Sequence, residues 1–222
     1  MSSNVTACSA WRLYVIVDRA AAGSRDLAQI AAAAIRGGAD VIQLRDKSAT
    51  DEALVREAER LMRLTREAGV PLIINDRPAI ARAVGADGAH LGQGDMPVAA
   101  ARALLGPGAI LGKSTHSLEQ ALAAEAEGAD YIGCGPVFAT PTKPDYGSVG
   151  LELIGRAGAR IAVPVVCIGG IDVKTLPQVL AAGAERVAVV RAVCAAPDPE
   201  AVARALKRAL IQPPRATATP PL

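Results

Sequence analysis

The chain has very few aromatic residues, and its charges nearly cancel. Only 2% of its 222 residues are Phe, Trp or Tyr, although 51% are hydrophobic, so a core must consist mainly of Ala, Val, Leu and Ile. This composition is typical of a globular protein in which helices pack closely on a sheet. The 24 basic and 22 acidic residues give a formal charge of +2, and no block of like charges predicts a nucleic-acid partner.

Two further absences concern the compartment in which the protein works. No run of about 18 apolar residues predicts a transmembrane helix, and the stretch MSSNVTACSA lacks the basic and hydrophobic regions of a signal peptide. The four cysteines are scattered without a CxxC pair, so they indicate neither a zinc site nor a disulfide framework. We therefore expect a cytoplasmic protein with no membrane partner.

Short segments that are apolar on both faces alternate with helical patterns, as in parallel sheets covered by helices. These segments span residues 13–17, 41–44, 71–75, 88–91, 109–112, 131–135, 164–169 and 186–190. The clearest helix covers residues 51–68, between Thr50 as N-cap and Gly69 as the terminating residue. Weaker helices are predicted at 26–36, 78–84, 97–104, 117–126, 151–158, 174–181 and 198–210.

A recurring tripeptide, Gly-Ala-Asp or Gly-Ala-Glu, precedes every second predicted strand. It occupies residues 38–40, 85–87, 128–130 and 183–185. Its glycine can adopt the left-handed conformation that ends a helix before the chain turns back into the sheet. The chain therefore resembles four double units.

Eight strands alternating with eight helices can form either an open doubly wound sheet or a closed barrel. We favour a single-domain (β/α)8 TIM barrel over residues 11–211, because polar residues follow nearly every strand and do not gather at one switch point. Residues 1–10 and the proline-rich segment 212–222 are predicted to be disordered.

The segments that follow the strands of such a barrel converge on one site. After the second strand, Gln43, Arg45 and Lys47 are expected to point into the barrel mouth, unless they are solvated or fill a layer of the core. Asp76 and Asp95 follow the third and fourth strands, where two carboxylates suit Mg²⁺. Each aspartate could instead cap the next helix.

The fifth and sixth strands lead into further polar segments. Ser114 follows the fifth strand, and His90 or His116 is a candidate general base, although an isolated histidine here is more commonly structural. The long segment 135–150 after the sixth strand is predicted to bind a ligand rather than to be a variable surface loop. It offers Thr140, Thr142 and Lys143.

Segments 168–171 and 189–192 end the last two strands, where barrels frequently bind phosphate through backbone N–H groups. They form one anion-binding region, and the carboxylates and basic residues after strands two to four form another. Two phosphorylated substrates would explain two such regions.

These motifs, in order along the chain, resemble those of the thiamine-phosphate synthase family. The resemblance runs from about residue 13 to about residue 195 and includes QLRDK, NDR, HLGQGD, GKSTHS, YIGCGPVFATPTK, IGGI and VAVV. It implies a transferase of thiamine biosynthesis that joins hydroxymethylpyrimidine diphosphate to thiazole phosphate and releases diphosphate through a carbocation-like displacement. The implied partners are these two small phosphorylated heterocycles, with Mg²⁺ as cofactor, and a homodimer is compatible with the sequence.

The resemblance also assigns roles by motif. The implied metal ligands are Asp76 and Asp95, and the implied catalytic residues are Arg45, Lys47, Ser114 and Lys143. The residues implied to bind the pyrimidine diphosphate are Gln43, Leu44, Arg45, Asp46, Lys47, Asn75, Ser114 and Lys143, and those implied to bind the thiazole phosphate are Thr140, Pro141, Thr142, Gly170, Val190 and Arg191. The family usually has serine where Arg191 stands, so this guanidinium could grip phosphate, crowd the pocket or point away.

Three alternatives remain at this point. A thiazole tautomerase of the same superfamily would not use the pyrimidine diphosphate, and a silent phosphate-binding barrel would need no charges for a leaving group. An epimerase or isomerase acting on a phosphorylated sugar would need a pair of acid and base groups that the sequence does not reveal.

Overall fold

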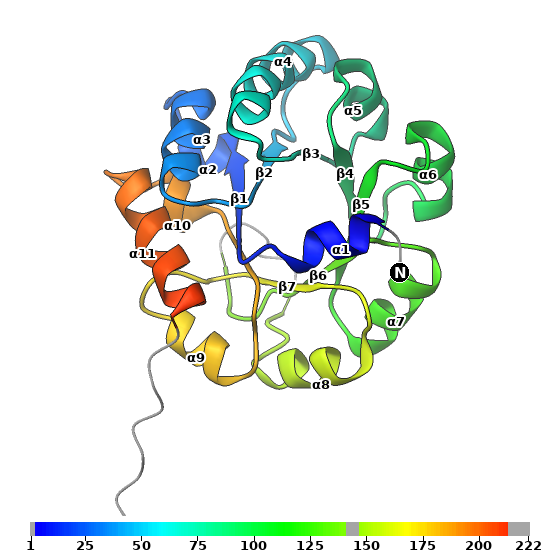
Figure 1. The fold of residues 1–222 in the computed structure, drawn as a ribbon, viewed down its shortest axis with the longest axis vertical. Helices are drawn as coiled ribbons and strands as arrows, with labels where there is room; N and C mark the ends of the chain where they lie inside the picture. Colours follow the sequence, from blue (N-terminus) through cyan, green and yellow to red (C-terminus); the bar gives the residue numbers. More distant parts are fainter. Residues whose placement is uncertain (1–2, 141–146, 213–222) are drawn as a thin grey trace, which may run out of the picture.

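Eight parallel strands close into a barrel in chain order, and helices surround it (Figure 1). The computed structural model describes residues 3–140 and 147–212. The strands are β1 (Leu13–Asp18), β2 (Val41–Arg45), β3 (Leu72–Asn75), β4 (Gly88–Leu91), β5 (Ile110–Thr115), β6 (Tyr131–Cys134), β7 (Val165–Ile168) and β8 (Val187–Val189). The predicted (β/α)8 barrel is confirmed, and the open sheet is wrong, because β1 pairs with β8 as well as with β2.

The helices largely occupy the predicted positions. They are α1 (Ser3–Ser9), α2 (Arg19–Ala22), α3 (Leu27–Arg36), α4 (Asp51–Ala68), α5 (Pro78–Val84), α6 (Val98–Leu105), α7 (Leu118–Ala126), α8 (Glu152–Arg160), α9 (Leu176–Ala181), α10 (Arg191–Cys194) and α11 (Pro199–Ile211). At α4, the Thr50 hydroxyl accepts from the Ala53 N–H, and Gly69 ends the helix at a φ of 65°. None of the helices described is long and apolar enough to cross a membrane.

The predicted disorder of residues 1–10 is wrong for residues 3–9, which form α1. Helix α1 buries Val5 and Cys8, and Cys8 joins a cluster with Trp11 that continues into the barrel interior. This apolar anchor explains why the segment is ordered although its composition is polar. The predicted disorder of 212–222 concerns residues that, apart from Gln212, lie outside the described part of the chain.

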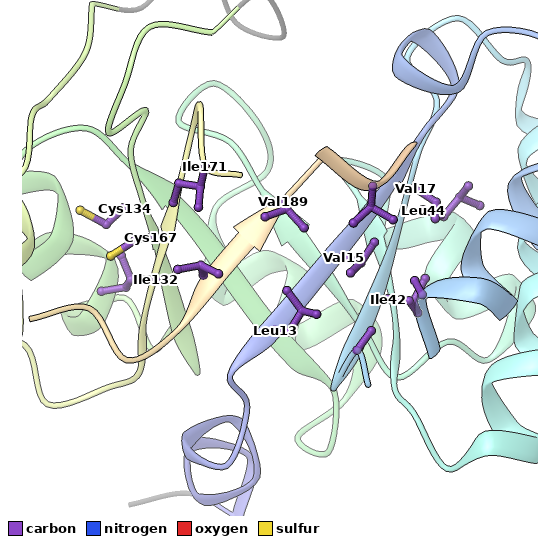
Figure 2. Close-up of a cluster of buried hydrophobic side chains, with 14 of the residues drawn as sticks. Leu13, Val15, Val17, Ile42, Leu44, Ile132, Cys134, Cys167, Ile171 and Val189 are labelled. Carbon is purple, nitrogen blue, oxygen red and sulfur yellow. The ribbon is translucent and has the colours of Figure 1, made fainter. Parts of the chain in front are cut away.

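The scarce aromatic residues gather at one place. Three of the five, Trp11, Tyr14 and Tyr131, pack inside the barrel, with ring centroids 5.2 to 5.8 Å apart. The outward faces of the strands carry small aliphatic side chains that pack against the helices, among them Leu13, Val15 and Val17 (Figure 2). The alternation along β1 therefore separates two cores, one inside the barrel and one outside it.

The recurring Gly-Ala-Asp tripeptide has a structural role that its glycine only partly explains. All four glycines have positive φ, between 65° and 97°, as predicted. In three repeats the acidic side chain also accepts a hydrogen bond from the first part of the preceding strand: Asp40 from Leu13 N, Asp87 from Leu72 N, and Asp130 from Leu111 N, at 2.8 to 2.9 Å. Each of these carboxylates thus joins two neighbouring strands within one double unit. In the fourth repeat Glu185 pairs with Arg186 instead.

Replacing Asp130 with alanine is expected to lower the free energy of unfolding by about 3–5 kcal/mol, the range for breaking a buried ion pair. Asp130 is 3% exposed, pairs with Arg102 at 2.6 Å and accepts the Leu111 N–H, so its loss removes the charge partner of Arg102 and leaves a buried N–H without this acceptor. The matched control is Asp87→Ala, which removes an exposed carboxylate bonded to Leu72 N and should cost about 1 kcal/mol. Urea unfolding measures both, and equal losses would contradict this account.

Candidate active site

A cavity of about 410 Å³ opens at the C-terminal ends of the strands. Its lining from β1 to β5 is mainly polar and includes Tyr14, Gln43, Arg45, Asn75, His90 and Ser114. Further polar lining residues are His116, Tyr131, Thr140, Asp172 and Arg191. Its lining from β7 and β8 is mainly apolar and includes Val166, Ile168, Ala188, Val189 and Val190. A volume of this size suits small-molecule ligands, and the two differing sides can each receive a different chemical group.

The polarity at the end of β2 follows the alternation of a strand. Gln43 and Arg45 face the cavity, as predicted, whereas Leu44 faces the helices and is fully buried in the outer core (Figure 2). The Leu44 side chain thus points away from the cavity, because successive side chains on a strand point to opposite faces, and a substrate contact of Leu44 stays a prediction for its backbone.

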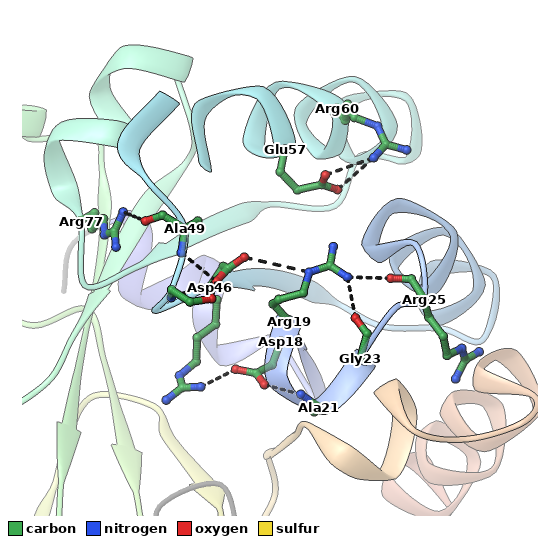
Figure 3. A network of polar contacts seen from close by, with 12 residues as sticks. Asp18, Arg19, Ala21, Gly23, Arg25, Asp46, Ala49, Glu57, Arg60 and Arg77 are labelled. Atoms are coloured by element: carbon green, nitrogen blue, oxygen red, sulfur yellow. Dashed lines mark hydrogen bonds and ion pairs between the residues drawn. The ribbon is translucent and has the colours of Figure 1, made fainter. Parts of the chain in front are cut away.

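Asp46 and Lys47, the next two residues, make different contacts. The Asp46 carboxylate accepts the Ser48 and Ala49 N–H groups at 3.0 Å and so closes the turn before α4 (Figure 3). Asp46 does not line the cavity, and its carboxylate shapes the loop, so its substrate contact stays a prediction. Lys47 does not line the cavity either, and its ammonium lies 3.2 Å from an Asp76 carboxylate oxygen.

Arg45 is held in place by a residue that the sequence did not single out. Its guanidinium pairs with the carboxylate of Asp18, the neighbouring residue across β1 and β2 in the barrel register. Asp18 is 1% exposed, and its other oxygen accepts the Ala21 N–H at the start of α2 (Figure 3). Since the carboxylate is bonded on both oxygens, it fixes the direction of Arg45 at the cavity wall.

Asp76 and Asp95 lie side by side, next to Lys47. Burial first, and hydrogen bonding with the Asp76 side chain second, raise the pKa of Asp95 above its usual value. Asp76 has a φ of 59°, and in the described part of the chain it is the one non-glycine residue with positive φ. Such strain is kept where a side chain must be aimed at a site.

Neither aspartate caps the following helix, which was the alternative. The N-cap residues of α5 and α6 are Arg77 and Pro97, and neither helix has a side-chain cap. The Asp95 carboxylate instead accepts the Gly92 N–H at 2.6 Å, within its own loop.

The paired carboxylates fit a hard divalent cation. Burial raises the pKa of Asp95, the nearby Asp76 adds to this rise, and a bound cation would favour the charged form of both carboxylates. Among residues 3–140 and 147–212, no group of three or more His, Cys, Asp or Glu side chains is arranged to hold a metal. The protein would thus supply two oxygen ligands and leave the other positions to phosphate and water, as is usual for Mg²⁺.

The two histidines are both engaged in hydrogen bonds, which favours their structural interpretation over a general base. The two ring nitrogens of His90 lie 2.9 Å from the Tyr131 hydroxyl and 2.9 Å from the Ser114 hydroxyl. The His116 Nδ1 contacts the Gly135 carbonyl oxygen, and the His116 backbone N–H donates to Gln120 Oε1 at 2.7 Å. Ser114 lines the cavity, as expected.

The last two strands form the other side of the cavity. Gly170, Val190 and Arg191 all contribute to its lining. Gly170 has a φ of 66°, and a Cβ there would lie 2.7 Å from the Phe138 Cβ, so the position requires glycine. Its N–H meets no acceptor among the residues that the structure describes, which leaves it available to an anion.

The long loop after β6 contributes Thr140 to the cavity lining. Pro141, Thr142 and Lys143, the other expected ligand-binding residues of this loop, lie outside the described residues. The cavity also uses Tyr14 and Tyr131, which the sequence reasoning missed. Their signal was present, because a tyrosine is unusual in a chain so poor in aromatic residues.

Comparison with known proteins gives one consistent result. The family described as thiamine monophosphate synthase matches residues 13–193. A thiamine-phosphate synthase of Chloroflexus aurantiacus is 50% identical over 202 residues, covering 90% of this chain and 93% of that protein. A second, from Roseiflexus sp. (strain RS-1), is 50% identical over 195 residues, covering 87% of this chain and 83% of that protein. The solved thiamine phosphate pyrophosphorylase of Pyrococcus furiosus superposes with a TM-score of 0.83 at 37% identity, covering 90% of this chain and 96% of that one.

Proposed function

The chain belongs to the thiamine monophosphate synthase family, and from this premise we propose that it joins hydroxymethylpyrimidine diphosphate to thiazole phosphate, forming thiamine phosphate and diphosphate. The observation that carries the proposal is the carboxylate pair Asp76 and Asp95, with Lys47 paired to Asp76. The pair does not itself line the cavity, but Asp76 directly follows Asn75, which lines the cavity as Arg45 does. An oxygen-ligand pair and two cations on one rim suit a diphosphate leaving group.

Asp76 and Asp95 would hold Mg²⁺, which when bound neutralises charge on the diphosphate oxygens. Arg45 would bind the diphosphate from the cavity wall, and Lys47 would approach it from the solvent side, where its side chain is 61% exposed. Lys143, from the loop after β6, is proposed as a third cation on the same group. Asn75 and Gln43 would bind the pyrimidine through donors and acceptors on the polar side of the cavity.

The displacement itself requires no covalent bond between the protein and a substrate. The bond from the pyrimidine CH₂ carbon to the diphosphate oxygen breaks, the aminopyrimidine ring delocalises the positive charge, and the thiazole nitrogen forms the new bond to carbon. The electron pair of the broken bond leaves with diphosphate, so no side-chain nucleophile is needed. Catalysis would therefore come from alignment and preorganised charge, and Ser114 would orient the pyrimidine substrate.

The thiazole phosphate would bind on the other side of the cavity. Its ring would pack against Ile168 and Val190, and its phosphate would reach the Gly170 N–H. Thr140 lies at the same opening, and Pro141 and Thr142 are proposed to complete the site. Because Arg191 lines the cavity, we propose that its guanidinium binds this phosphate in addition to backbone N–H groups.

We propose a cytoplasmic location on the basis of the cysteines. All four are unpaired and buried, and burial raises the pKa of the Cys134 and Cys194 thiols to about 11. Unreactive, reduced thiols of this kind are typical of a reducing compartment.

Omitting each substrate in turn tests the function. Diphosphate release should require the pyrimidine diphosphate, thiazole phosphate and Mg²⁺ together, and thiamine phosphate should appear in equal amount. Colorimetric diphosphate detection with chromatographic identification of the product measures both. Interconversion of thiazole tautomers without diphosphate release would instead identify the tautomerase, and phosphate binding without turnover would identify a silent barrel.

A further inference from the structure

A chain of hydrogen bonds runs across the interior of the barrel, between residues that line the cavity. The Gln43 Nε2 donates to the Tyr14 hydroxyl at 2.7 Å, and that hydroxyl lies 2.8 Å from the Tyr131 hydroxyl. Tyr131 in turn lies 2.9 Å from the His90 Nδ1, and the His90 Nε2 lies 2.9 Å from the Ser114 Oγ. Five side chains from five different strands therefore form one continuous path.

The barrel register makes room for this path. His90, Gly112 and Tyr131 are neighbours across β4, β5 and β6, so Gly112 stands between the two side chains. A Cβ at Gly112 would lie 2.1 Å from the Tyr131 Cζ and 2.5 Å from the His90 Nδ1. The absence of a side chain at this one position is what lets the imidazole meet the phenol.

The path has a direction because it begins at the Gln43 Nε2, an amide nitrogen that can only donate. The Tyr14 oxygen therefore accepts a hydrogen bond from Gln43. The Tyr14 hydroxyl has its own single proton, and Tyr131 is the one acceptor in reach of it among the described residues. Tyr14 and Tyr131 are 2% and 1% exposed, although both contribute to the cavity lining. Tyr131 therefore accepts a hydrogen bond from Tyr14 and donates one to the His90 Nδ1.

From this direction we infer that Tyr14 and Tyr131 are positioning residues that keep His90 in the Nε2–H tautomer and turn the Ser114 hydroxyl proton toward the ligand. A neutral imidazole whose Nδ1 accepts must carry its proton on Nε2, which then donates to the Ser114 oxygen. Ser114 lines the cavity, and its own proton is left to point into it.

The ligand atom opposite Ser114 is consequently a hydrogen-bond acceptor, such as a ring nitrogen or an anionic oxygen. This last step rests on the proposed function, whereas the tautomer and the direction of the path belong to the free protein. The two are therefore tested separately.

The tautomer can be read directly by ¹⁵N NMR on ligand-free protein labelled at histidine. The chain has two histidines, so His90→Gln assigns both sets of ring signals. We expect the His90 Nε2 to carry the proton and the Nδ1 to be unprotonated. A proton on Nδ1 would overturn the inference, whatever reaction the protein catalyses.

The positioning role is tested with Tyr131→Phe, which keeps the ring beside Trp11 and removes only the hydroxyl. We expect a mixture of His90 tautomers and turnover lowered about fivefold, roughly the effect of one lost hydrogen bond. Thr115→Val is the matched control, because it removes a buried hydroxyl that donates to the Gly133 carbonyl, next to Ser114 but outside the path. The control should retain the His90 tautomer and normal turnover. If Tyr131→Phe keeps both as well, or if both variants lose them equally, the positioning role is wrong.

Discussion

Asp95→Ala is expected to lower turnover about 100-fold or more, the size of effect seen when one preorganised electrostatic partner of a transition state is lost. The variant leaves Asp76 as the single carboxylate at the proposed metal site, so Mg²⁺ and the diphosphate would lose a fixed contact. The residual activity should also need a higher Mg²⁺ concentration. Steady-state rates of diphosphate release over a Mg²⁺ titration, at saturating substrates, measure both effects.

The fold should survive this substitution. The Asp95 side chain accepts one hydrogen bond from Gly92, and its loss is offset by relief from the repulsion that helps to raise the Asp95 pKa. The matched control is Asp51→Ala, which removes a carboxylate that is 75% exposed and pairs with Arg77 after the neighbouring strand. It should leave turnover and Mg²⁺ dependence unchanged. Full activity in Asp95→Ala, or an equal loss in both variants, would remove the metal site from the proposed mechanism.

Arg45→Gln is expected to have two separate effects. Turnover should fall about 100-fold or more, because a cation facing the leaving group is lost. The free energy of unfolding should also fall by about 3–5 kcal/mol, because Asp18, which is 1% exposed, would keep a buried and unpaired charge. Activity assays alone therefore cannot distinguish a catalytic role of Arg45 from a structural one.

The double variant Asp18→Asn/Arg45→Gln separates the two effects. Asparagine can still accept the Ala21 N–H at the start of α2, and two neutral amides can bond to each other without a stranded charge. We expect the double variant to regain most of the lost stability, measured by urea unfolding, and to remain as inactive as Arg45→Gln. Recovery of turnover along with stability would show that Arg45 acts only by holding the fold. Asp18→Asn alone keeps the Arg45 guanidinium but no longer fixes its direction, so the turnover of this variant should be intermediate.

Local sequence patterns predicted much of the fold. Helix α4 begins and ends where its N-cap threonine and its glycine predicted, and the glycines of the Gly-Ala-Asp repeats have the expected positive φ. These features depend on neighbours within a few residues, so the sequence contains them directly. The strand alternation was also available, and applied strictly to β2 it would have turned Leu44 toward the helices.

Contacts between residues that are distant in the sequence were harder to predict. Helix α1 looked disordered because its own sequence is polar, and its order comes from packing Cys8 with Trp11 against the barrel interior. Asp18 looked like the end of a strand, and only the register of β1 with β2 places its carboxylate against Arg45. Neither contact has a signal within one segment, because each arises from how two segments are brought together.

The sequence by itself determined the order of strands and helices, the family, and the set of polar segments that meet at the rim, because periodicity and motifs are properties of the chain. Only the tertiary structure decided which of those side chains touch. Tyr14 and Tyr131 are 117 positions apart and meet because the closed barrel fixes one register and one stagger between its strands. A shift of one residue in that register would turn each side chain to the opposite face, so the site exists only in the folded barrel.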